Sequence, residues 1–330
     1  MIDISIVVPV YNVEKFLPKC LDSLIVQDEC VKEIILINDG STDNSLQICQ
    51  DYALKDKRIK IIIQENKGLS ATVRVGVKAA TCDYIGFVDS DDFVEPDMFK
   101  LMADKMEQSG ADVVFCDYDT VAENGKKLTT KNLYIDLKEN VFAKENGTFS
   151  VQILPTLKDG RFIPGFRVNK LFKRDSIINN ISFDNLGVIH GEDIALTVPI
   201  MFASEKIACV HKSLYHYFQR STSIVHSYNR NNLRDWALIM DIIDRARREY
   251  NYKIEKFDDV SLALLLSLCL FKIRISTLSR KRKKDEYKFI GTDKQVRQLL
   301  STVKIKTNFK HKIVFKLLKY RMYGLLSLIY

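Results

Sequence analysis

The first 120 residues alternate short apolar runs with stretches of helical periodicity, and this alternation restricts the fold more than any other feature. The apolar runs are seven residues each, at 4–10 (ISIVVPV), 33–39 (EIILIND), 59–65 (IKIIIQE) and 84–90 (YIGFVDS). Helix-forming segments separate them at 13–26, 45–55 and 69–80. Strands joined by single helices form parallel sheets, so the chain is predicted to contain a doubly wound, mostly parallel, Rossmann-like α/β sheet.

Each apolar run ends in a cluster of polar residues, at 9–12, 38–43, 65–68 and 89–92. Ligands of doubly wound sheets bind beyond the carboxyl ends of the strands. A single Asp or Ser at such a position can be a helix N-cap, which is the alternative interpretation of Ser41, Asp43 and Asp92. Four polar clusters on one edge of a sheet instead predict a binding site.

Three carboxylates, Asp89, Asp91 and Asp92, occupy four consecutive positions after the last of these runs. They repel one another unless a positive charge compensates them. An Asp-x-Asp sequence at a strand end offers the hard oxygen ligands that Mg²⁺ and Mn²⁺ prefer, and such an ion commonly bridges to a phosphate. The cluster therefore predicts a divalent metal that carries a diphosphate.

Six motifs occur in the order VPVYN, INDGSTDNS, ENKGLSATVR, FVDSDD, GEDIAL and FQRSTSI. Together they resemble the family 2 glycosyltransferases of the GT-A fold, of the bacterial surface-polysaccharide type, over residues 1–226. The resemblance implies a hexosyl- or N-acetylhexosaminyltransferase that moves a sugar from a UDP-sugar to an acceptor hydroxyl. It further implies an inverting reaction that depends on Mn²⁺ or Mg²⁺.

The resemblance also implies which residues bind the donor. Pro9 and Tyr11 would form a wall of the nucleobase pocket, and Asp39 would contact the edge of the base. The remaining implied donor residues are Glu65, Asn66, Gly68, Arg74, Asp89, Ser90, Arg220 and Ser223. Arg220 and Ser223 belong to an R-x-x-S loop that would close over the leaving diphosphate. The implied metal ligands are Asp91 and Asp89, with His226 as a third.

Four of these residues have plain structural alternatives. Tyr11 could be a half-buried core aromatic, Arg74 a surface charge on a helix, and Gly68 a simple turn. His226 could be a structural or solvated histidine. Two positions also depart from the family pattern. Val75 follows Arg74 where the family often has Asn or Asp, and Asn38 stands where the family often has a first Asp.

The second acidic motif is Gly191-Glu192-Asp193. Displacement at an anomeric carbon needs a base that takes the proton of the acceptor hydroxyl. By the resemblance Asp193 is that base and Glu192 its neighbour near the acceptor, and adjacent carboxylates raise each other's pKa toward neutral pH. The alternative is an Asp that stabilises a helix N-terminus. Asn169 and Lys170 are implied contacts of the acceptor.

Residues 229–330 are predicted to form a second, helical region, separated near Tyr228 from the catalytic domain at 1–228. Its predicted helices cover 231–250, 260–278, 293–303 and 310 to the end. Residues 272–330 carry 17 Lys or Arg and three acids, a balance of +14, while the rest of the chain has −6. A basic helix with an apolar face predicts contact with an anionic membrane surface, where a glycan or lipid-linked acceptor would lie. A solvated bundle rim or a homo-oligomer interface is the alternative.

Seven scattered cysteines without a CxxC pair indicate reduced, buried thiols. The longest apolar run, 260–271, is too short to span a membrane, so we expect a cytoplasmic protein, peripheral on the inner face of the cell membrane. Two other classes remain open. One is a nucleotidyltransferase on a related sheet, although a G-x-G loop near the first strand is absent. The other is a non-catalytic module that binds anionic polymers through 272–330, although no nucleic-acid-binding motif accompanies the charge.

Overall fold

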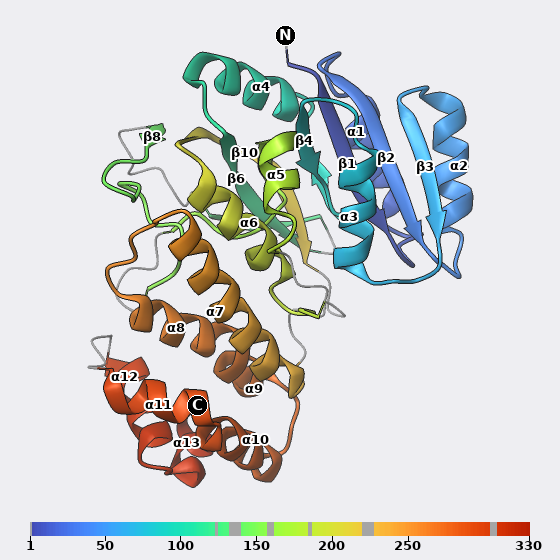
Figure 1. Cartoon of the computed structure of the whole chain (residues 1–330). Coiled ribbons are helices and arrows are strands. Elements are labelled where there is room, and N and C mark those ends of the chain that lie inside the picture. The colour runs from blue at the N-terminus through green and yellow to red at the C-terminus, as the bar shows by residue number, and fades with distance from the viewer. Residues whose placement is uncertain are drawn as a thin grey trace.

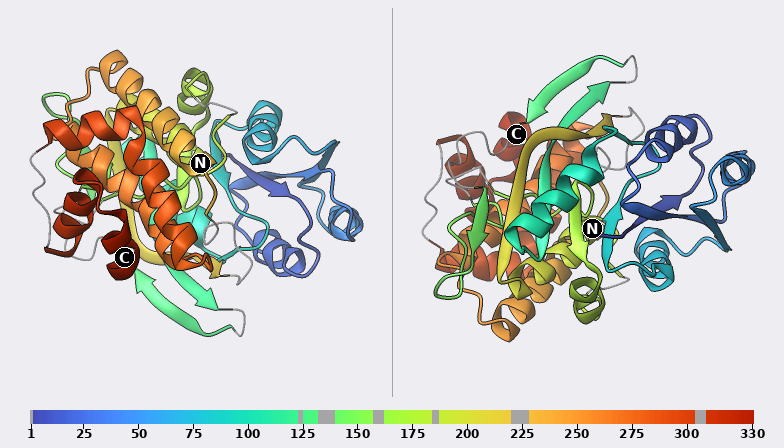
Figure 2. Two further views of the ribbon diagram at one scale, coloured as in Figure 1. Left: turned by 90° about the horizontal axis from the view of Figure 1, so that it is seen from below. Right: turned by 90° about the horizontal axis from the view of Figure 1, so that it is seen from above.

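The computed structural model describes residues 2–122, 125–131, 140–156, 162–183, 187–219, 228–303 and 309–330. In these ranges the chain forms a ten-stranded sheet with helices on both faces, followed by a group of C-terminal helices (Figure 1). The first strands and the last helices lie at opposite ends of the molecule in both further views (Figure 2).

The predicted parallel sheet is confirmed. Its strands are β1 (Ile4–Val10), β2 (Val31–Asp39), β3 (Ile59–Gln64) and β4 (Tyr84–Phe87), which lie in the order β3-β2-β1-β4 and are all parallel. The connecting helices are α1 (Leu17–Ile25), α2 (Ser45–Lys55) and α3 (Leu69–Ala79). Helix α1 begins four residues later than predicted, with a proline in its first turn, where the missing N–H costs nothing.

The other half of the sheet is mixed and was not predicted strand by strand. Strand β9 (Lys170–Lys173) is antiparallel to both β4 and β6 (Val113–Ala122), and the long β10 (Lys206–Gln219) is parallel to β6. The short strands β5 (Phe93–Val94), β7 (Lys127–Lys131) and β8 (Val141–Ala143) pair antiparallel with β10, β6 and β10 respectively. Because β9 lies beside β4, the segment before it comes close to the aspartate cluster.

Alternate side chains of each parallel strand enter two different cores. Ile6 and Val8 of β1 pack on the face that α1, α2 and α4 (Met98–Ser109) cover. Val7 faces the other core, with α3, α5 (Arg174–Asn180) and α6 (Glu192–Ala203). This second core continues into the C-terminal helices as far as Tyr330. The sheet and the C-terminal region therefore share one hydrophobic core.

The C-terminal region contains α7 (Asn231–Glu249), α8 (Phe257–Leu265), the π-helix η2 (Leu266–Leu270), α9 (Phe271–Ile275), α10 (Arg280–Thr292), α11 (Lys294–Thr302), α12 (Phe309–Lys319) and α13 (Tyr323–Ile329). Two predicted helices are wrong in detail. The helix expected over 260–278 contains the π-turn and ends at Ile275. The last helix is broken, because Arg321 adopts a φ of 60°. Helix α10 was not predicted, since its first turns are almost entirely charged.

The thiols agree with the sequence analysis. All seven cysteines are free, and six are buried. No helix in the described ranges combines the length and apolarity that a membrane span needs.

Candidate active site

The loops after β1 and β2 bind each other through their own side chains. The backbone N–H of Asn12 donates to Ser41 Oγ at 3.1 Å, and that of Glu14 donates to Asp43 Oδ2 at 3.0 Å. The N-cap of α2 is Asn44. Ser41 therefore joins the two loops and does not cap the helix. Asp43 does both, because its Oδ1 also accepts from the Ser45 N–H at the start of α2, at 3.0 Å.

Two predicted donor residues differ in exposure at the end of β1. Pro9 is buried in the strand, whereas Tyr11 lies just beyond it with 48% of its surface exposed. Tyr11 is therefore not a core aromatic, and its ring is accessible at the edge where the parallel strands end. Its contact with a nucleobase stays a prediction.

Asp39, the last residue of β2, fastens the loop that follows β3. Its Oδ1 accepts from Gln64 Nε2 at 2.6 Å and from the Lys67 N–H at 2.9 Å, and its Oδ2 accepts from the Gly68 N–H at 3.0 Å. The carboxylate is 4% exposed. It therefore shapes the loop in this structure, and its predicted contact with a base edge stays untested.

The loop after β3, which Asp39 holds, contains the other predicted donor residues of the third motif. Glu65 and Asn66 are exposed, and Gly68 has a φ of 82°. The preceding loop approaches closely, because a Cβ on Gly40 would lie 2.8 Å from the Asn66 nitrogen. Glycine at position 40, with a φ of 71°, allows this approach.

Arg74 of α3 extends toward the end of α5. Its Nη2 donates to the carbonyl of Ile181 at 3.2 Å, and the residue is half-buried. Arg74 therefore joins two elements around the site and is not only a surface charge. Its predicted contact with a nucleotide is not tested by this geometry.

Asp92 is the structural member of the aspartate cluster. It is 1% exposed and accepts from the Tyr215 hydroxyl at 2.5 Å and from the Phe218 N–H at 2.7 Å. Burial, followed by the charges of Asp91 and Asp89, raises its pKa well above the usual value. Asp92 thus fastens β10 to the end of β4 and does not cap α4, whose N-cap lies five residues later.

A buried arginine joins the two acidic motifs. Arg167 is 2% exposed, and its Nη2 and Nη1 form ion pairs with Asp89 and Asp193 respectively. Burial opposes its charge, but the charges of Asp193 and Asp89 outweigh burial and raise its pKa. Arg167 supplies a positive charge that the sequence analysis assigned to a metal diphosphate alone. Its only signal in the sequence was its place just before Asn169 and Lys170.

The second acidic motif lies where predicted, at the start of α6. Gly191 is the N-cap with a φ of 93°, and Glu192 and Asp193 form the first turn. Burial, and then the charge of Asp193, raises the pKa of Glu192 to about 7. Burial also raises the pKa of Asp193, although the neighbouring Arg167 opposes this shift. The site therefore contains two carboxyl groups whose pKa values lie above the ordinary range, which is typical of proton-transfer sites.

Asn169 and Lys170 lie in the packed interior, with 1% and 0% of their surfaces exposed. Asn169 Nδ2 donates to the Cys116 carbonyl at 2.5 Å, and Lys170 Nζ donates to Asn169 Oδ1 at 3.0 Å. Burial lowers the pKa of Lys170 to about 7. Both side chains pack inside the protein in this structure, and their predicted contact with an acceptor stays a prediction.

The predicted metal site can be compared with the donor groups present. Within the described ranges, no three His, Cys, Asp or Glu side chains converge to hold a metal by themselves. Mg²⁺ that is bound with a substrate phosphate commonly uses one or two carboxylates and keeps several waters. Asp89 and Asp91, both partly exposed, fit such an ion. Ser90 between them is buried.

Three predicted residues, Arg220, Ser223 and His226, lie outside the described residues. The loop that would close over the diphosphate and the third metal ligand are therefore not placed by the structure.

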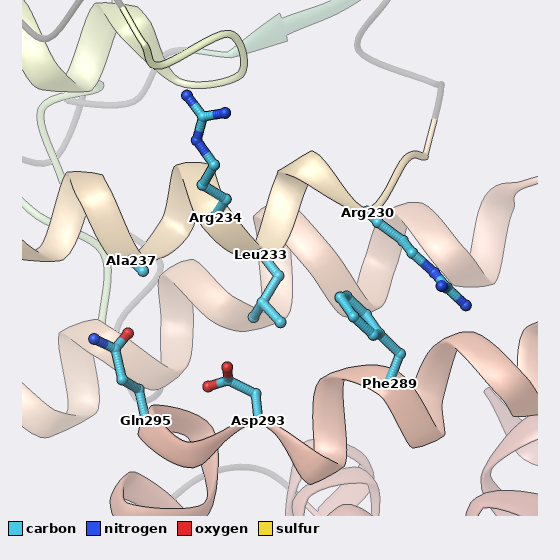
Figure 3. A pocket seen from close by; sticks show the side chains of 7 residues that line it. All are labelled: Arg230, Leu233, Arg234, Ala237, Phe289, Asp293 and Gln295. Carbon is cyan, nitrogen blue, oxygen red and sulfur yellow. The ribbon is translucent and has the colours of Figure 1, made fainter.

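A cavity of about 220 Å³ lies away from the strand ends, between α7 and the α10–α11 segment. Its lining residues are Arg230, Leu233, Arg234, Ala237, Phe289, Asp293 and Gln295 (Figure 3). The guanidinium of Arg230 stacks on the Phe289 ring at 4.6 Å and pairs with Glu286 at 3.0 Å. These contacts bind α7 to α10.

Comparisons with known proteins place the chain among the glycosyltransferases. The model of the family described as Glycosyl transferase family 2 matches residues 5–172. The glycosyltransferase EpsJ of Bacillus subtilis (strain 168) is 30% identical over 349 residues, which cover 99% of this chain and 95% of EpsJ. Glycosyltransferase GlyG of Streptococcus pneumoniae serotype 4 is 31% identical over 238 residues, which cover 68% of this chain and 73% of GlyG.

Solved structures show the same fold. The structure of S. aureus TarS 1-349 in complex with UDP has a TM-score of 0.70 at 19% identity, and covers 99% of this chain and 90% of that chain. The complex of the same protein with UDP-GlcNAc has a TM-score of 0.70 at 18% identity, with the same coverage of both chains. The GT-A fold implied by the six motifs is confirmed, and so are the added C-terminal helices predicted from residues 229–330.

Proposed function

The chain belongs to glycosyl transferase family 2, and on this premise we propose that it transfers the sugar of a UDP-sugar to an acceptor hydroxyl with inversion at the anomeric carbon. The proposal rests mainly on the two ion pairs of Arg167. They join Asp89 of the Asp-x-Asp motif to Asp193 of α6. The UDP and UDP-GlcNAc complexes of the TarS structures support the choice of donor.

In the proposed reaction Asp193 is the base. It takes the proton of the acceptor hydroxyl while the hydroxyl oxygen bonds to the anomeric carbon of the sugar. The bond from that carbon to the diphosphate oxygen breaks, and UDP leaves with the electron pair. The raised pKa of Asp193 suits a base that must accept a proton near neutral pH.

Arg167 has two roles in this proposal. Its charge keeps Asp193 in the ionised form that a base needs, because the ion pair favours the carboxylate. It also adds a buried positive charge next to the Asp-x-Asp motif, where the leaving diphosphate would gain negative charge.

A divalent metal would be held by Asp89 and Asp91, with His226 as a further candidate, and would neutralise charge on the diphosphate when bound. Mn²⁺ and Mg²⁺ both suit two carboxylates and phosphate oxygens. Arg220 and Ser223 would bind the same diphosphate. The nucleotide would be contacted by Tyr11 after β1, by Asp39 at the end of β2 and by Arg74 of α3.

We also propose that the C-terminal helices meet an anionic membrane surface that carries a lipid-linked or polysaccharide acceptor. Phe309, Tyr320 and Leu328 are 81%, 68% and 53% exposed. Exposed basic side chains accompany them at Lys310, Lys312 and Lys316 of α12 and at Arg321 in the turn that follows it. Exposed aromatic and basic residues on short helices favour contact with acidic headgroups.

Vesicle flotation tests the membrane contact. Vesicles that contain phosphatidylglycerol should bind the protein, and phosphatidylcholine vesicles should not. Changing both Lys312→Glu and Lys316→Glu should weaken binding at least about tenfold, because each lysine near the surface contributes on the order of 1 kcal/mol. The matched control changes two exposed lysines of the other region, Lys57→Glu and Lys78→Glu. Equal binding by the two double variants would contradict the proposal.

UDP release from a panel of UDP-sugars tests the reaction, with Mn²⁺, Mg²⁺ or EDTA. Wild type should release UDP from one sugar in a metal-dependent way, and Asp91→Asn and Asp193→Asn should each reduce the rate by on the order of 10²-fold or more. Asp241→Asn, an exposed carboxylate on α7, is the control. No release and no metal-dependent UDP binding would contradict the proposed function, whereas pyrophosphate as the product would indicate nucleotidyl transfer.

A further inference from the structure

The loop that carries the second acidic motif is held by a helix of the C-terminal region. The backbone N–H of His190 donates to Asp235 Oδ2 at 3.0 Å, and the His190 ring nitrogen Nδ1 lies 3.1 Å from the same oxygen. Both side chains are at least 95% buried. One carboxylate from α7 thus fixes the residue that precedes the Gly191 turn.

A neighbouring residue of α7 makes a second contact with the same loop. Arg234 Nη2 donates to the carbonyl of Gly187 at 3.0 Å. In Figure 3 the Arg234 side chain points away from Asp293 and Gln295 and toward the loop above α7. The loop is therefore attached to α7 at two positions, three residues apart.

The Gly191 turn itself leaves no room between the two regions. A Cβ at Gly191 would lie 2.7 Å from Ile239 Cδ1 of α7 and 3.7 Å from Leu268 Cδ2 of η2. With a φ of 93°, this residue combines an unusual backbone conformation with a close approach. The start of α6 therefore packs directly against α7 and the π-helix.

The π-helix places a buried lysine near the same motif. Lys272 follows η2 in α9 and is 7% exposed. Burial lowers its pKa, while the carboxylates of Glu192 and Asp235 oppose that shift. Its ammonium group therefore interacts electrostatically with both carboxylates, and π-turns of this kind are frequent at functional sites.

One carboxylate oxygen of Asp235 accepts no hydrogen bond from the described residues. Its Oδ2 receives both contacts from His190, while its Oδ1 is buried and has no hydrogen-bond partner among the described residues. An unpaired buried carboxylate oxygen is costly, so a purely structural role accounts poorly for it. Functional positioning is a reason for a protein to keep such a group.

We propose that Asp235 is a positioning residue for the reaction: by holding His190 it sets the Gly191 turn and thereby the placement of Glu192 and Asp193. The proposal deepens the proposed function and rests on it for the role of Asp193. It assigns the C-terminal region a part in catalysis that is separate from membrane contact.

Asp235→Ala compared with Asp241→Ala tests the proposal. Asp241 lies on the same helix, pairs with Arg245 and is exposed. In hydrogen–deuterium exchange, Asp235→Ala should speed exchange in a peptide covering 187–203, and Asp241→Ala should not. Calorimetric binding of UDP should stay within about twofold of wild type for both variants. With the UDP-sugar that wild type uses, kcat should fall about 10- to 100-fold for Asp235→Ala, because small misplacements of a base have effects of this size.

Asp235→Asn distinguishes position from charge and serves if the alanine variant does not fold. Asparagine keeps an oxygen that accepts from the His190 N–H, so exchange protection and most of kcat should return. A decrease in kcat for Asp235→Asn as large as the decrease for Asp193→Asn would overturn the proposal. So would equal exchange in Asp235→Ala and Asp241→Ala. Wild type that neither releases UDP nor binds it in a metal-dependent way would contradict the proposed function, while the exchange comparison would still decide whether Asp235 holds the loop.

Discussion

The sheet and the C-terminal helices use charge in opposite ways. Around the strand ends, carboxylates are partly or fully buried, and Arg167 joins two of them by ion pairs. On α12 and in the turn that follows it, basic side chains lie on the surface, and exposed apolar side chains lie on the same segment and on α13. Buried charges need partners close by, whereas exposed charges are solvated and contribute little to stability. Charge therefore has a local structural role in the first region and is available for a partner in the second.

The two regions nevertheless share one hydrophobic core. A single hydrophobic cluster contains Val7 of β1 and Tyr330 at the end of the chain. Trp236 of α7 donates its indole N–H to the Ser261 carbonyl at 3.1 Å, which packs α7 on α8 within the same cluster. The two regions that differ in charge are therefore packed on one shared core.

The largest effect is expected from removing the C-terminal region. A chain that ends at residue 228 would expose the face of the shared core that α7 and α8 cover. It should show no cooperative thermal unfolding transition, because it loses a large part of its buried apolar surface. Circular dichroism during heating measures this. A shortened chain that unfolds cooperatively and binds UDP as the full chain does would show that the regions are independent.

A large effect is also expected from Arg167→Met. It leaves Asp89 and Asp193 without their shared cation, and loss of one member of a buried ion network costs roughly 3–5 kcal/mol of unfolding free energy. Urea denaturation measures this. The control, Arg245→Met, breaks an exposed pair with Asp241 and should cost at most about 1 kcal/mol. Adding Asp193→Asn to Arg167→Met should recover part of the loss, and the absence of any recovery would contradict the network.

An intermediate effect is expected from Glu192→Gln, and it depends on pH. The pKa of Glu192 is raised from 4.5 to about 7, first by burial and then by Asp193. The folded protein therefore binds more protons than the unfolded chain between these values, and wild type loses stability as pH rises through this window. Glu192→Gln removes that loss.

The variant should consequently exceed wild type in unfolding free energy by at most about 3 kcal/mol at pH 8, with no gain below about pH 4.5. Urea denaturation at the two pH values measures the difference. Its UDP-release activity should fall if Glu192 contacts the acceptor. A gain that is the same at both pH values would show that the effect does not come from ionisation of Glu192.

The smallest effect on stability is expected at the exposed apolar side chains. Phe309→Ser removes a ring that is 81% exposed, so the unfolding free energy should change by less than about 0.5 kcal/mol. Phe315→Ser, a buried ring of the same helix, is the matched comparison and should cost several kcal/mol. Equal costs would mean that Phe309 is packed in solution, which would weaken the case for a surface contact.

Much of the parallel half of the sheet could be predicted from the sequence. The four apolar runs and the helical segments between them match β1 to β4 and α1 to α3, because alternation of apolar residues is a local property of the chain. The start of α6 at Glu192 was also predicted. The mixed half was not, since the position of β9 between β4 and β6 depends on pairing between distant segments.

Some residues of the candidate site could likewise be predicted from the sequence and others could not. The residue types at the strand ends predicted Asp89, Asp91 and Asp193 as candidates, and the structure brings the first and last of these to the same arginine. Arg167 and Asp235 could not be predicted. Neither belongs to a motif, and each acquires its role from a partner that is 26 or more residues away in the chain.

The class of fold, the edge of the sheet where polar residues gather and the family of the chain follow from periodicity and short motifs, so they can be read from the sequence. The pairing of the charges, the burial of individual side chains and the helix that holds the Gly191 turn emerge only in the folded chain. Burial and ion pairing depend on distances between residues that are far apart in the chain. Neighbouring residue types alone do not specify those distances.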